Sequence, residues 1–85
     1  METVYLDALR VYETAGNVYL LHVDELTSQQ KEEAKKTLLD ADKVLQVWKA
    51  QRTLGELSSE NVSEVIEMKN SLIDMTAKYF GVEVK

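Results

Sequence analysis

The sequence contains no cysteine and no proline, a single histidine, and three glycines among 85 residues. The absence of cysteine excludes disulfide bonds, zinc–thiolate sites, iron–sulfur clusters and thiol nucleophiles. Because proline is absent and glycine stands only at Gly16, Gly55 and Gly81, helix breakers are scarce and long helices are favoured. Three isolated glycines also cannot form the phosphate-binding patterns GxGxxG or GxxxxGK[ST].

Basic clusters and long apolar runs are missing as well. The net charge is −5, and the densest basic pair, Lys35 and Lys36, follows Glu32 and Glu33 by one turn. Binding to phosphates needs a basic surface, so we expect no direct contact with nucleic acid. No stretch approaches the roughly 18 apolar residues of a membrane span, and the N-terminus lacks a basic run. The sequence therefore predicts a soluble cytoplasmic protein that does not bind membranes.

The length predicts one domain, residues 1–85, near the small end of what folds alone. An apolar fraction of 45% is ordinary for a globular domain. A chain of this size buries only about 60–65% of its unfolded surface. With no disulfide to add stability, oligomerisation is the simplest way to bury more area.

Residues 4–24 form three successive heptads that each begin with Val-Tyr: VYLDALR, VYETAGN and VYLLHVD. Seven residues make two helical turns, so in a helix the three pairs stack on one face. A polar stripe runs opposite, which indicates a helix over about residues 3–25. The alternative is a β-hairpin that turns at residues 15–17, because Val and Tyr favour strands.

Two further helices are predicted, over about residues 28–52 and 59–80, followed by a short tail at 82–85. Thr27 and Gln30 match a capping box for the first of them. Ser58 or Ser59 caps the other.

Short connections between long helices predict an all-α fold, a three-helix up-down-up bundle. The alternative fold is an N-terminal β-hairpin plus an antiparallel helical hairpin.

Residues with catalytic or metal-binding chemistry form no recognisable pattern. His22 has no partner at metal-ligand spacing, and we expect it to be partly buried or to lie in an interface. The carboxylates fall on stripes expected to be solvated, and no serine has a base in a nucleophile motif. We therefore expect no enzyme activity, no metal and no cofactor.

The apolar face of the first predicted helix covers more than half its circumference, which is more than one partner helix needs. Leucines also break the polar stripes, and such residues form patches that partners cover. The sequence thus predicts a non-enzymatic protein–protein interaction module that self-associates, most simply as a dimer. Its expected interface consists of Tyr5, Ala8, Tyr12, Ala15, Tyr19, Leu20, Leu21, His22 and Leu39.

Two alternative functions follow from other features. The first is an acidic regulator or inhibitor, of the kind that a virus uses against host defence, occupying a basic site on a nucleic-acid-binding protein. Its acidic face would consist of Glu60, Glu64, Glu67 and Asp74. The second is an oligomer with a small-ligand pocket between its subunits.

Overall fold

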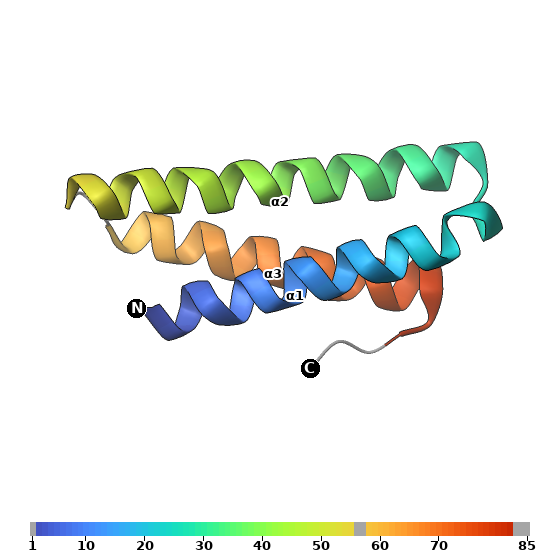
Figure 1. Ribbon diagram of the computed structural model, residues 1–85, viewed down its shortest axis with the longest axis horizontal. Coiled ribbons are helices and arrows are strands. Elements are labelled where there is room, and N and C mark those ends of the chain that lie inside the picture. Colours follow the sequence, from blue (N-terminus) through green and yellow to red (C-terminus); the bar gives the residue numbers. More distant parts are fainter. Residues whose placement is uncertain (1, 56–57, 83–85) are drawn as a thin grey trace.

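A computed structural model describes residues 2–55 and 58–82 of the chain, and within them the fold is three helices. These are α1 (Glu2–His22), α2 (Ser28–Leu54) and α3 (Ser59–Phe80), with a 3-10 turn, η1 (Val23–Glu25), after α1. The helices run up, down and up, so that α1 and α3 are parallel and α2 is antiparallel to both (Figure 1).

This arrangement confirms the predicted all-α three-helix bundle. The alternative hairpin is wrong, because residues 8–24 lie within α1 and η1. The helix α1 continues without a break through Gly16, and its small residues Ala8 and Ala15 are buried against the rest of the bundle.

The helix ends follow from local capping chemistry. The Thr27 hydroxyl accepts a hydrogen bond from the backbone N–H of Gln30 at 3.2 Å, and the Gln30 side chain accepts one from the Thr27 N–H at 3.0 Å. Ser58 and Asn61 form the same reciprocal pair at the start of α3. Reciprocal capping satisfies two otherwise unpaired donors at each helix start.

The observed helix bounds differ from the expected ones at the end of α1, at the end of α2 and, by one residue, at the start of α1. α1 ends at His22 and is followed by η1, whereas α2 runs to Leu54 before Gly55 adopts a left-handed conformation with φ of 71°. α3 ends at Phe80, where Gly81 has φ of 65°. Residues 83–85 of the expected tail lie outside the described part of the chain.

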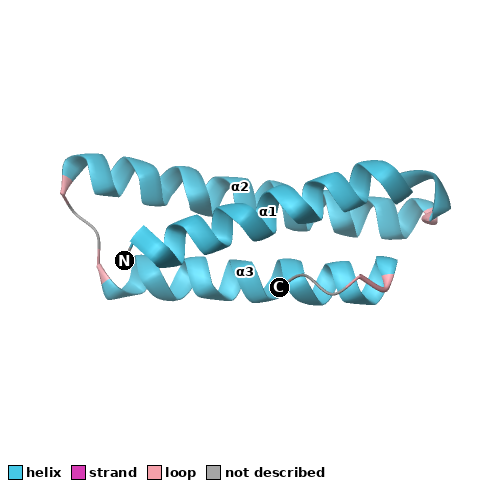
Figure 2. Ribbon diagram, turned by 60° about the horizontal axis from the view of Figure 1, so that its bottom comes forward, coloured by secondary structure: helices cyan, strands magenta, loops and turns pink. Residues whose placement is uncertain are grey.

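The three helices lie side by side around one apolar core, and the molecule measures 42 × 22 × 17 Å (Figure 2). Small residues of α1 and α2 let the helices approach closely, and larger residues of α2 and α3 fill the space between them. The buried apolar residues are Ala8, Val11, Ala15, Leu26, Ala34, Ala41, Leu45, Trp48, Val65, Met68, Leu72 and Met75.

Candidate interaction surfaces

The centre of the Val-Tyr face packs inward, against the rest of the same chain. Ala8, Val11 and Ala15 are completely buried in the bundle core. Two of the residues expected in an interface between chains, Ala8 and Ala15, therefore contact the chain's own core. The physical reason is that the small chain first needs this face for its own core, and the alanines allow close packing of the helices.

The first two heptad tyrosines lie half-buried at the edge of the core, where α1 meets α2. The ring of Tyr5 stacks on that of Trp48, with centroids 6.0 Å apart and planes inclined by 13°. The pKa of Tyr12 is raised by burial and, to a smaller extent, by the negative charge of Asp42 on α2. These two tyrosines thus close the α1–α2 contact rather than the centre of the core.

An open groove lies between α1 and α2 beyond these contacts, with a volume of about 470 Å³. A Cβ added at Gly16 would meet no heavy atom within 4 Å, so the groove is open at this point. Apolar and aromatic side chains from both helices form most of its lining. The lining residues are Tyr12, Glu13, Gly16, Asn17, Tyr19, Leu20 and Leu38.

The three leucines expected in the interface are all exposed. Leu20, Leu21 and Leu39 are 71%, 78% and 54% exposed. Of these, only Leu20 lines the groove, where Leu38 of α2 also lies. Leu21 is one residue further along α1 and so points about 100° away around the helix. The structure therefore selects Leu20 as the exposed leucine that belongs to the groove.

His22 lies away from this groove, at the end of α1. Its Nδ1 is 2.5 Å from Oε2 of Glu25 in η1. Its ring is 6.0 Å from that of Phe80, at an angle of 38°. These contacts tie the end of α1 to the end of α3, and His22 is half-exposed there.

A second groove, of about 320 Å³, runs between α2 and α3 on a different side of the bundle. Carboxylates stand on both of its sides, from Asp40 on α2 and from Glu64 and Glu67 on α3. The complete lining is Thr37, Asp40, Ala41, Val44, Glu64, Glu67, Met68 and Ser71.

The predicted acidic face is only partly gathered at this groove. Glu60 lines an adjoining shallow depression together with Glu64 and Glu67, whereas Asp74 is exposed and lines neither hollow. Asp40 joins the acidic set from another helix. Sequence reasoning missed it, because only the fold shows that α2 and α3 bring these carboxylates together.

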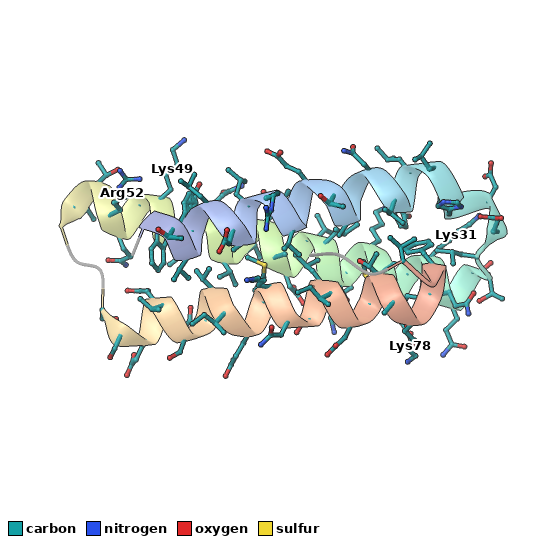
Figure 3. The ribbon with its side chains drawn as sticks, turned by 90° about the horizontal axis from the view of Figure 1, so that it is seen from below. Lys31, Lys49, Arg52 and Lys78 are labelled. Atoms are coloured by element: carbon teal, nitrogen blue, oxygen red, sulfur yellow. The ribbon has the colours of Figure 1, made fainter. Side chains whose placement is uncertain are left out.

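Four cationic side chains lie near the ends of the bundle. Figure 3 shows Lys31 and Lys78 near one end, and Lys49 and Arg52 near the other. Among residues 2–55 and 58–82, no group of three or more His, Asp or Glu side chains is placed to hold a metal ion. None of the helices described is both long and apolar enough to cross a membrane.

No protein-family model, no curated protein and no solved structure matches the chain.

Proposed function

We propose that the protein is a small non-enzymatic interaction module that self-associates as a dimer through the α1–α2 groove. The observation that carries the proposal is the placement of Leu20. This exposed leucine stands on the groove beside Gly16, where the surface is open. A protruding side chain and a recess that can receive it are thus adjacent on the same face.

Such a face is complementary to a second copy of itself. Leu20 and Gly16 are four residues apart, which is about one helical turn. A two-fold axis crossing α1 at the level of Val18 places Leu20 of each chain over Gly16 of the other. The same two surfaces then meet in both directions, and the contact closes as a dimer without growing into a filament.

The chemistry of the lining suits this contact. Full burial of a leucine side chain stabilises an association by about 1.5–3 kcal/mol, and the two-fold axis makes the contact twice. Tyr12 and Tyr19 line the groove and supply aromatic surface, which is enriched in protein interfaces. The absence of a side chain at Gly16 allows the two α1 helices to approach closely.

The acidic residue of the groove does not oppose its own copy in this arrangement. With the axis at Val18, the two Glu13 side chains are offset by ten residues, or about 15 Å along the helix. That offset exceeds the Debye length of about 8 Å at physiological salt, so their repulsion is largely screened.

The test is the mass in solution, measured by size-exclusion chromatography with light scattering over about a hundredfold range of concentration. The wild-type chain is expected at twice its monomer mass of 9.7 kDa at the upper concentrations. Leu20→Glu is expected to be monomeric throughout, because it places a charge in the recess of the other chain.

Leu21→Glu is the matched control, since it makes the same change at the next residue but outside the groove. It is expected to dimerise like the wild type. A wild-type chain that stays monomeric at every concentration contradicts the proposal, and so does an equal loss of dimer in both variants.

A further inference from the structure

We infer that the α2–α3 groove is a docking site for a basic amphipathic helix of a partner protein. This site shares no lining residue with the α1–α2 groove, so the dimer contact proposed above does not use its residues. The inference does not rest on dimer formation.

The floor of this groove is apolar and shallow. Ala41 and Met68 are buried there, and Val44 is half-buried between them and the solvent. Val47 follows Val44 by three residues and is 44% exposed, so it extends the apolar surface along α2 by one turn.

Both sides of the floor are acidic. Asp40 projects from α2, and Glu64 and Glu67 project from α3, all three exposed to solvent. Within the described part of the chain, the salt bridges are Arg10–Asp7 and His22–Glu25, so none of the three carboxylates is paired with a cation. The groove therefore carries carboxylates on each side of an apolar line, two on α3 and one on α2, where Lys36 and Lys43 stand one turn before and after Asp40.

The occupant that matches this pattern is a helix with one apolar stripe flanked by Lys or Arg on both sides. Helices bind grooves of this kind with their apolar residues in the floor, while their flanking charges determine orientation and partner choice. The lining on α3 spans residues 64–71, or about 10 Å, which corresponds to two turns of a bound helix.

Other ligand classes fit less well. Nucleic acid would be repelled by these carboxylates and by the net charge of −5. No three of the described His, Asp and Glu side chains converge on a metal position. A protein segment of opposite charge is the class that satisfies both the floor and the rim.

The experiment measures binding of a fluorescent synthetic peptide of about 18 residues to the full chain by anisotropy. Its sequence places Leu at helical spacing on one face and Lys on the flanks. Two matched peptides are compared with it, one with every Lys replaced by Glu and one with the same composition in scrambled order. Only the first is expected to bind, and raising salt from about 50 to about 500 mM is expected to weaken its binding about tenfold or more.

The triple variant Asp40→Asn, Glu64→Gln, Glu67→Gln is expected to weaken binding about tenfold or more, because it removes the charges of the rim.

The control triple variant Asp7→Asn, Asp24→Asn, Glu32→Gln loses the same charge outside the groove. Its effect is expected to remain below about threefold, since screened charges at a distance contribute little.

Backbone amide chemical shifts then locate the peptide on the chain, with the largest changes expected at residues 37–44 and 64–71. The monomeric variant Leu20→Glu is expected to bind the peptide as the wild type does, which separates this site from the dimer contact.

Several results overturn the inference: no binding, equal weakening in the two triple variants, equal binding of the scrambled peptide, or chemical-shift changes centred on Tyr12 and Leu38. Displacement of the peptide by micromolar Ca²⁺ also overturns it, because a metal would then be the ligand of these carboxylates.

Discussion

The rings of Tyr5 and Trp48 are stacked across the α1–α2 contact, with 6.0 Å between their centroids. Tyr5 lies in the first turn of α1, and Trp48 lies towards the end of the antiparallel α2. The stack therefore joins the two helices at one end of the bundle. The open groove begins at Tyr12, seven residues or about 10 Å further along α1. One end of the α1–α2 contact is thus filled by aromatic rings, while the groove along the second half of α1 is left accessible.

Trp48 is the main core residue at that end, and its removal is expected to be costly. It is 1% exposed, and Trp48→Ala is expected to lower the free energy of unfolding by about 3–5 kcal/mol. Trp48→Phe is expected to cost clearly less, because the buried indole Nε1 has no hydrogen-bond partner among the described residues. Urea unfolding followed by circular dichroism measures both. Leu54→Ala, at an exposed position, is the control, and equal losses for Trp48→Phe and Trp48→Ala would contradict this account.

Two tyrosines are expected to ionise above the ordinary value of 10.0. The Tyr79 hydroxyl donates a hydrogen bond to the Glu33 carboxylate, which raises the pKa of Tyr79, with smaller contributions from burial and from the charge of Glu33. Glu33→Gln is therefore expected to lower the pKa of Tyr79 towards 10.0. For Tyr12, burial is the larger cause, so Asp42→Asn is expected to lower the pKa only in part. Ultraviolet absorbance of tyrosinate during an alkaline titration measures these shifts.

The sign of the stability effect follows from the direction of these shifts. A raised pKa in the folded state means that folding favours the neutral tyrosine. Its stabilising contribution is complete below pH 10 and is lost as the pH rises through the raised pKa. Tyr79→Phe removes one of the two late-ionising groups and serves as the assignment control. A titration in which all four tyrosines ionise together near pH 10 would be inconsistent with the Glu33 contact.

The ends of the helices could be predicted because their signals are local. The pair Thr27 and Gln30 specifies the start of α2, and Gly81 after Phe80 specifies the end of α3, in each case through groups only a few residues apart. The apolar residues Val65, Met68, Leu72 and Met75 of α3 stand at helical spacing, and all four are buried.

The rotation of α1 could not be predicted in the same way. Its apolar face is so wide that spacing alone does not tell which line of residues faces the core, and the fold places Ala8, Val11 and Ala15 there. The same rotation decides that Leu20 rather than Leu21 lies on the groove. The sequence shows that Gly16 lowers the stability of the helix locally. That Gly16 lies in a groove follows only from the packing of α2 beside α1.

The caps of α2 and α3 are each expected to contribute measurable stability. Thr27→Ala and Ser58→Ala remove the side-chain acceptor for the N–H of Gln30 and Asn61, and each is expected to lower the free energy of unfolding by about 1 kcal/mol. Ser59→Ala is the matched control, because Ser59 is the first residue of α3 and is exposed. Its expected effect is below about 0.5 kcal/mol. If Ser59→Ala costs as much as Ser58→Ala, the cap has been assigned to the wrong serine.

Gly16→Ala is expected to change folding and association in opposite directions. Gly16 lies inside α1, and an added Cβ meets open space, so alanine is expected to raise the free energy of unfolding by about 0.5–1 kcal/mol at low protein concentration. In the proposed dimer the same methyl group occupies the recess that receives Leu20 of the other chain, so the dimer is expected to weaken. Gly81→Ala separates the two effects: its φ of 65° is strained for alanine, and it is expected to destabilise the fold by about 1 kcal/mol without changing the dimer. Denaturant unfolding and light scattering on the same samples provide both readings, and a Gly16→Ala chain that dimerises more tightly would exclude close packing at this position.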